Sequence, residues 1–217
     1  MFLSNIKKRI KPKLDGIAVI GLTGQSGSGK TLVSDYLADC GYSVINADLV
    51  ARAVTIRGSE CNKKLYELFP GCVNDELELD RRKLGSIVFA DREKLDLLNA
   101  TIFPYINELI EDEIRQFKSQ GSSLVILDAP TLFEAGADKY CDLIISVVSD
   151  DNIRQQRIAL RDNLDENQIK DRFSSQKKKC FYVKNSDYVL ENNSTKEALL
   201  SQAKQLMDSI KERIDVH

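Results

Sequence analysis

The feature that most constrains this chain is a glycine-rich run, "GLTGQSGSGKT" at residues 21–31, which continues an apolar run beginning at Ile17. The apolar run "IAVIGL" is rich in β-branched residues, which is typical of a strand buried on both faces. The residues that follow, "KTLVSDYLADC", carry apolar side chains at helical spacing, and Gly41 can end that helix. Strand, loop and helix in this order, with the spacing G-x-x-x-x-G-K-T, predict a loop that wraps a phosphate.

Each residue type in this loop suits a nucleoside triphosphate. Glycines allow the unusual dihedral angles that point successive N–H groups inward, and the helix beginning near Lys30 adds its positive end. Lys30 can reach the β- and γ-phosphates, and the Thr31 hydroxyl can bind Mg²⁺. The alternative is a flexible Gly/Ser turn before Lys-Thr, which the flanking strand and helix disfavour. The predicted nucleotide contacts are Gly24, Gln25, Ser26, Gly27, Ser28, Gly29, Lys30, Thr31 and Leu32.

The rest of the chain alternates strand and helix patterns, which predicts an α/β fold with a parallel sheet flanked by crossover helices. Strands are expected in "SVINA", "SLVILDAP", "CDLIISVVS" and "SDYVLEN". Helical patterns occupy residues 59–120, where Pro104 is expected to begin a new helix, and residues 151–162, 165–179 and 195–214. Asp165 and Gln168 resemble an N-cap with its partner three residues on.

Composition narrows the function further. The net charge is −2, which argues against a general nucleic-acid or membrane-surface binder, and no apolar run reaches the length of a membrane span. The five cysteines include no C-x-x-C pair, and the one histidine is His217, so a zinc site or a histidine-based triad is not expected. Free thiols and the lack of a signal-peptide pattern predict a cytoplasmic protein. The basic residues 1–15 are expected to form a solvated extension, the alternative being a targeting or nucleic-acid arm.

Two aspartates follow predicted strands at the edge where ligands of parallel sheets gather. Asp48, in "VINADLVAR", can orient an acceptor hydroxyl or accept its proton. Its alternative role is the N-cap of the next helix, and both roles can hold at once. Asp128, in "LVILDAPTLFE", stands where P-loop enzymes carry the acidic residue that holds Mg²⁺, directly or through water. The alternative for Asp128 is a strand-end residue of a turn.

A series of arginines follows the predicted strand "CDLIISVVS". Arg154, Arg157 and Arg161 are spaced by three and four residues, so one helix face carries all three. Phosphoryl transfer needs cations on the migrating group, and a mobile basic lid can supply them while excluding water. The alternative is a solvated face of mixed charge.

Together these segments resemble the dephospho-CoA kinase family over about residues 17–199. The similarity covers the phosphate loop, "VINADLVAR" with Asp48 and Arg52, the helices of "DRRKLGSIVFADREKLDLLNATIFPYI", and "LDAPTLFEAG". It continues through "RQQRIALRDNLDENQIKDRFSSQ", with Arg157, Arg161, Arg172 and Gln176, into "SDYVLENN", with Asp187 and Asn192.

The resemblance implies transfer of the ATP γ-phosphate to the ribose 3′-hydroxyl of dephospho-CoA, the last step of coenzyme A synthesis. It implies one P-loop kinase domain over 16–217, with a parallel-sheet core (16–58, 121–149 and 185–217), a helical acceptor region (59–120) and a lid (150–184). The implied catalytic residues are Asp48, Lys30, Arg157 and Arg161, and the implied substrate contacts are Asp48, Arg52, Asp128 and Arg161. Arg157, Arg172 and Asn192 join the loop as nucleotide contacts, and Thr31 and Asp128 surround Mg²⁺. A monomer or weak homo-oligomer is expected, with no nucleic-acid or membrane partner.

The chain also departs from the family pattern. Asn46 stands where the family usually has an Asp, and Phe103-Pro104 stands where it usually has a His-Pro pair. Ala129 and Thr131 replace bulkier aliphatic residues, and Ser194 replaces a common glycine. These positions leave two other functions open: a P-loop kinase for another nucleotide or small-molecule hydroxyl, and a non-catalytic homologue that binds nucleotide or a CoA-like ligand. A GTPase is disfavoured because no N-K-x-D segment is present.

Overall fold

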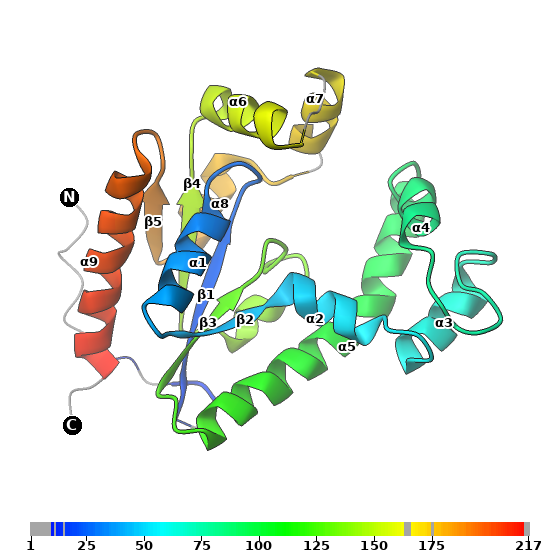
Figure 1. Ribbon diagram of the computed structural model, residues 1–217, viewed down its shortest axis with the longest axis horizontal. Coiled ribbons are helices and arrows are strands. Elements are labelled where there is room, and N and C mark those ends of the chain that lie inside the picture. Colours follow the sequence, from blue (N-terminus) through cyan, green and yellow to red (C-terminus); the bar gives the residue numbers. More distant parts are fainter. Residues whose placement is uncertain (1–9, 11, 15, 163–165, 175, 215–217) are drawn as a thin grey trace. The chain divides into compact units, whose positions relative to one another are not determined.

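A computed structural model describes residues 10, 12–14, 16–162, 166–174 and 176–214 (Figure 1). Its strands form one sheet in the order β2-β3-β1-β4-β5. β1 pairs in parallel with β3 and β4, and β4 pairs in parallel with β5. The strands are β1 (Ala18–Gly24), β2 (Ser43–Asn46), β3 (Leu124–Asp128), β4 (Leu143–Val148) and β5 (Tyr188–Glu191). The predicted α/β class with a parallel sheet is confirmed.

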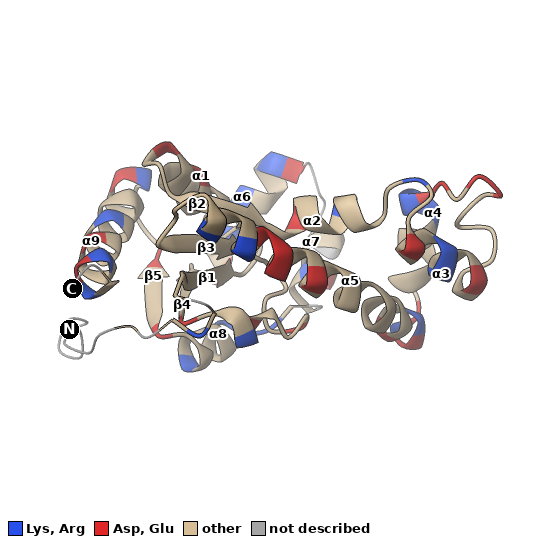
Figure 2. Ribbon diagram, turned by 90° about the horizontal axis from the view of Figure 1, so that it is seen from below, with Lys and Arg blue, Asp and Glu red and all other residues tan. Residues whose placement is uncertain are grey.

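Helices connect the strands. They are α1 (Lys30–Asp39), α2 (Ala47–Val54), α3 (Glu60–Leu68), α4 (Arg81–Val88), α5 (Arg92–Ser119), α6 (Asp151–Asp162), α7 (Glu166–Ser174), α8 (Lys179–Asn185) and α9 (Lys196–Ile214), with a 3₁₀ turn at Ala137–Tyr140. α1 ends as expected: Gly41 follows the C-cap with φ of 85°, a left-handed conformation that favours glycine. Figure 2 shows Lys and Arg interleaved with Asp and Glu along α9, as its sequence predicts for a solvated helix face.

The chain forms two compact units, residues 1–44 with 117–217 and residues 45–116. In the first unit every residue of β1 is buried, because β1 lies between two strands and has helices on its faces. Ile20 and Leu22 of β1 join Val33 of α1 and Leu199 of α9 in the core. This core fixes β1 and α1, and with them the loop that joins these two elements.

The second unit has its own core. Leu65 of α3 and Leu84 and Val88 of α4 are buried there, and half-buried residues of α5 pack against them. α5 corrects one prediction, because Pro104 lies inside a continuous helix and does not begin a new one. Proline removes one backbone hydrogen bond from a helix, but Ile102 and Tyr105 on its two sides pack on this core and hold the helical path.

Two further predictions are corrected in the first unit. The helical pattern over 165–179 does not form one helix: α7 ends at Ser174, and a separate α8 begins at Lys179. Residues 10 and 12–14 do not form a purely solvated extension, because Ile10 is buried in the main core and the backbone N–H of Lys13 donates to Asp142 Oδ1 at 2.7 Å. The rest of the basic extension and the expected cap at Asp165 lie outside the described residues.

Within the described part of the chain, no helix combines the length and the apolar character that crossing a membrane requires. The subdivision of the kinase domain into core, acceptor region and lid stays a prediction.

Candidate active site

The glycine-rich loop joins the end of β1 at Gly24 to the start of α1 at Lys30. Gly27 and Gly29 have φ of 77° and 100°, which side-chain-bearing residues rarely adopt. A Cβ on Gly29 would lie 2.3 Å from Asn192 Nδ2, and one on Gly27 would lie 3.0 Å from the carbonyl oxygen of Arg154. The loop therefore requires glycine at both positions, for its dihedral angles and for the close approach of neighbouring elements.

Asn192 and Arg157 lie against this loop. Asn192 is buried just beyond β5, and its Nδ2 donates to the carbonyl oxygen of Ser28 at 2.8 Å. Arg157 of α6 donates to Asn192 Oδ1 at 3.2 Å and to the carbonyl oxygen of Gly27 at 3.5 Å. The structure thus brings together three parts of the predicted nucleotide site that are far apart in the sequence.

Lys30 and Asp128 form an ion pair beside the loop. Asp128 is the last residue of β3, and its backbone is in register with Leu22 of β1. Lys30 Nζ donates to Asp128 Oδ1, and the two side chains are only 12 % and 3 % exposed. The adjacency of β3 and β1 places this carboxylate at the carboxyl edge of the sheet, where ligands of such sheets bind. Asp128 therefore lies beside the loop, paired with Lys30, and its role in the site stays a prediction.

The loop also holds polar atoms that lack partners. Among the described residues, the buried Ser28 Oγ and Gln25 Oε1 have no hydrogen-bond partner. Buried polar groups are normally satisfied, so these atoms are suited to a bound polar ligand. α1 begins directly at the loop, and its first N–H groups have no acceptor within the helix. These features fit a phosphate chain.

The residues present also fit Mg²⁺. Hydroxyl and carboxylate oxygens are the ligands that this ion prefers, and Mg²⁺ usually takes only one or two carboxylates, together with water and substrate phosphates. Thr31 lies in the first turn of α1, and Asp128 supplies a carboxylate beside Lys30. The described residues hold no cluster of three or more His, Cys, Asp or Glu side chains, so a cage built wholly from protein ligands is not present among them.

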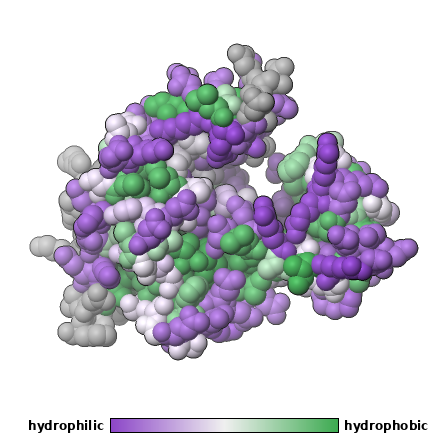
Figure 3. All heavy atoms as spheres, viewed as in Figure 1, coloured by the Kyte–Doolittle hydropathy of each residue, from purple (hydrophilic) through white to green (hydrophobic). Residues whose placement is uncertain are grey.

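Arg161 and Arg172 share one carboxylate. Arg161 donates to Asp162 through Nε at 2.7 Å and Nη2 at 2.8 Å, and Arg172 Nη1 also donates to Asp162. The hydrogen bond from Arg161 is the main reason that the pKa of Asp162 lies well below its usual range, and Arg172 adds to the effect. Figure 3 shows apolar surface among hydrophilic atoms on α6, and Leu160 of that helix is 88 % exposed.

Arg154 differs from its neighbours on the same helix face. It is 2 % exposed, and its Nε donates to the carbonyl oxygen of Ser26 at 2.9 Å. The arginine spacing signalled one shared face, but spacing alone could not show that Arg154 turns inward. The contact between Arg154 and the loop was missed for this reason.

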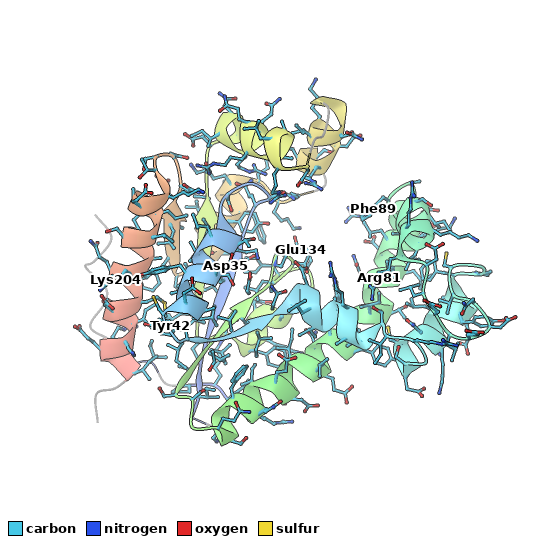
Figure 4. All side chains as sticks on the ribbon, viewed as in Figure 1. Asp35, Tyr42, Arg81, Phe89, Glu134 and Lys204 are labelled. Atoms are coloured by element: carbon cyan, nitrogen blue, oxygen red, sulfur yellow. The ribbon has the colours of Figure 1, made fainter. Side chains whose placement is uncertain are left out.

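Glu134 and Tyr182 interact electrostatically in the first unit. Glu134, labelled in Figure 4, follows β3 on an exposed turn. Burial, and then the negative charge of Glu134, raise the pKa of Tyr182 to about 12. Tyr182 therefore stays protonated in the neutral range.

Asp48 and Arg52 belong to α2 in the second unit. The helix is capped by Asn46, whose Oδ1 accepts from the backbone N–H groups of Asp48 at 3.0 Å and Leu49 at 3.1 Å. The alternative prediction that Asp48 caps α2 is therefore wrong, because Asp48 lies in the first turn with an exposed side chain. The departure at position 46 has a structural explanation: an amide oxygen caps as well as a carboxylate.

The second unit also holds α2 against α4. Arg81, labelled in Figure 4, donates from Nη2 to Thr55 Oγ1 at 2.5 Å and to the carbonyl oxygen of Arg52 at 3.3 Å. Phe89, at the end of α4, is 82 % exposed. The exposed side chains of this unit therefore include the carboxylate of Asp48, the guanidinium of Arg52 and the ring of Phe89.

A glycine-rich loop at the carboxyl end of a parallel strand, with a lysine and an aspartate paired beside it, defines a P-loop phosphotransferase. The family model for dephospho-CoA kinase matches residues 18–197, and the chain therefore belongs to the dephospho-CoA kinase family. This membership confirms the predicted function class, an ATP-dependent kinase of coenzyme A biosynthesis that acts on dephospho-CoA.

Individual relatives agree. The chain is 36 % identical over 199 residues to a dephospho-CoA kinase of Fusobacterium nucleatum, covering 89 % of this chain and 99 % of the relative. A crystal structure of a Thermus thermophilus protein is 31 % identical with a TM-score of 0.76, over 89 % of this chain and 98 % of that one. The dephospho-CoA kinase of Campylobacter jejuni, 21 % identical with a TM-score of 0.66 over 89 % and 97 % of the two chains, shares the fold.

Proposed function

We propose that this chain transfers the γ-phosphoryl group of ATP to the ribose 3′-hydroxyl of dephospho-CoA, with the donor on the glycine-rich loop and the acceptor beside Asp48. The observation that carries the proposal is the Lys30–Asp128 pair next to a loop whose buried Ser28 Oγ has no partner among the described residues. A preformed cationic and N–H-rich cradle is what phosphoryl transfer requires.

On the donor side, the loop N–H groups and the N-terminal end of α1 bind the β- and γ-phosphates. Lys30 then leaves Asp128 and contacts these phosphates. Arg157 already lies against the loop and stabilises charge on the transferring group. Arg161 and Arg172 contribute after exchanging Asp162 for phosphate oxygens. Thr31 and Asp128 would hold Mg²⁺, which neutralises phosphate charge when bound.

On the acceptor side, Asp48 orients the 3′-hydroxyl and accepts its proton as the oxygen attacks phosphorus. Its freedom from helix capping supports this role, because Asn46 supplies the cap. Arg52, one α-helical turn further on, is suited to an anionic group of the acceptor.

We further propose that the chain works in the reducing cytoplasm, as a monomer or weak homo-oligomer without nucleic-acid or membrane partners. Five free cysteines, two of them exposed, support the compartment, since free thiols persist where disulfides do not form.

The test is a coupled ADP-release assay with ATP and Mg²⁺, comparing dephospho-CoA with adenosine, AMP and shikimate as acceptors. We expect saturable turnover with dephospho-CoA alone, and phosphorus NMR of the product should place the new phosphate on the ribose 3′ oxygen. Turnover with another acceptor would make the chain a kinase of different specificity. ATP binding without turnover on any acceptor would favour a non-catalytic homologue.

A further inference from the structure

Arg154 is the largest side chain in the described core that is almost completely buried, and it is charged. It comes from the first half of α6, which lies close to the glycine-rich loop in the first unit (Figure 1). Burying an arginine is costly unless each of its donors finds a partner, so its contacts indicate what it does.

Each nitrogen of the guanidinium donates a hydrogen bond. Nη1 donates to Asp151 Oδ1 at 2.6 Å, Nη2 donates to Gln176 Oε1 at 3.2 Å, and the planar group lies 4.1 Å from the centre of the Phe173 ring. Nε donates to the carbonyl oxygen of Ser26, in the middle of the phosphate loop. Burial lowers the pKa of Arg154, and the hydrogen bond to Asp151 opposes this effect.

Gln176 and Arg154 together bind both backbone polar groups of Ser26. Its N–H donates to Gln176 Oε1 at 3.1 Å, and its carbonyl oxygen accepts from Arg154 at 2.9 Å. Gln176 therefore accepts from the loop and from Arg154 with one oxygen. The same helix lies so close to the loop that a Cβ added at position 27 would be 3.0 Å from the carbonyl oxygen of Arg154 and would crowd the helix.

We infer that Arg154 is a positioning residue for the phosphate loop: with Gln176 and Phe173 it couples the α6–α7 segment to the Ser26 peptide and sets the loop shape that ATP binds. The inference rests on the proposed function, because it takes ATP as the ligand of this loop. Each guanidinium nitrogen of Arg154 already has a protein partner and the side chain is buried, so we expect its effect on the reaction to pass through Ser26 and not through direct contact with a phosphate.

The decisive variant is Arg154→Lys, which keeps the charge but loses the planar fork that reaches three partners at once. We expect the KM and the Kd for ATP to rise about tenfold or more, because a charged hydrogen bond that shapes the loop is lost. The loop binds phosphates in the ground state and the transition state alike, so kcat should change much less than KM, and the KM for dephospho-CoA should stay unchanged. Arg213→Lys, in α9, is the matched control, because that arginine donates to the Tyr188 hydroxyl instead.

Gln176→Ala is the second variant, in case Arg154→Lys does not fold. It removes the acceptor of the Ser26 N–H and should weaken ATP binding in the same direction. In the double variant the two effects should combine to less than their product, because both residues hold one peptide.

The readouts separate positioning from simple stability. The inference would be overturned if both single variants had a lower melting temperature but bound ATP within about twofold of the parent affinity. A parent that binds ATP but does not phosphorylate dephospho-CoA would defeat the proposed function, and the loss of ATP affinity in the variants would still test Arg154.

Discussion

Lys30 Nζ contacts Asp128 Oδ1 directly, although the two residues stand 98 positions apart in the chain. The lysine begins α1, directly after the loop that follows β1, and the aspartate ends β3. The sheet order makes β1 and β3 neighbours. In this arrangement a buried carboxylate holds the cation at the place where the phosphate chain is expected. Under the proposed function, binding of ATP would exchange one anionic partner of Lys30 for another.

Lys30→Ala should lower kcat/KM by at least about a hundredfold, because a preorganised charge on the transferring phosphate is lost. It also leaves Asp128 buried without its partner, so the free energy of unfolding should fall by about 1–3 kcal/mol. Kinetics with ATP and dephospho-CoA, together with urea unfolding, measure both effects. Adding Asp128→Asn should restore much of the stability without restoring turnover. Near-normal turnover in Lys30→Ala would contradict the role of the loop.

Asp48→Asn should lower kcat strongly and leave the KM for ATP unchanged, because the donor does not use the acceptor's base. Since Asn46 caps α2, the same change should barely alter stability. Asn46→Ala provides the complement: it removes the cap and should cost about 1 kcal/mol of unfolding free energy. Steady-state kinetics and chemical denaturation of both variants test this division. An effect of Asp48→Asn confined to ATP affinity would speak against its assignment as the base.

Gly29→Ala should abolish tight ATP binding and destabilise the first unit. The new Cβ would meet Asn192 Nδ2 at 2.3 Å in a backbone conformation with φ of 100°. Gly41→Ala is the matched control, since its φ is 85° but nothing lies within 4 Å of an added Cβ. The control should show only backbone strain, about 1–2 kcal/mol, with normal ATP binding. Titration calorimetry measures the ATP affinity of Gly29→Ala and Gly41→Ala. Equal losses of affinity in the two variants would show that backbone strain, and not the clash with Asn192, weakens ATP binding.

The Asp162 cluster predicts a pH dependence of stability. The pKa of Asp162 is lowered in the folded chain by Arg161 and Arg172, so the stability it contributes is fully present above the ordinary aspartate pKa, about 3.9. That contribution shrinks only as the pH falls from there through the lower folded pKa. Unfolding free energies of Asp162→Asn and the parent should therefore differ by a constant amount in the neutral range and converge in acid. A difference between Asp162→Asn and the parent that stays constant into strong acid would contradict the assignment.

Local features of the site could be predicted from the sequence. The strand, the glycine-rich loop and α1 follow from hydrophobic patterning and spacing within one continuous segment, and Gly41 marks the end of that helix. Family membership follows from short motifs in order. Predictions failed where tertiary packing overrode local propensity: Pro104 stays inside α5, and Ile10 joins the main core.

The sequence by itself determined the chemistry of this protein, because the residue types that bind phosphate lie in one short segment. Tertiary structure alone decided which distant residues serve that segment. The contacts of Lys30 with Asp128, of Arg154 with Ser26 and of Asn192 with Ser28 span 98, 128 and 164 positions. They arise because the strand order β3-β1-β4-β5 brings the ends of non-consecutive strands, and the segments after them, to one edge of the sheet.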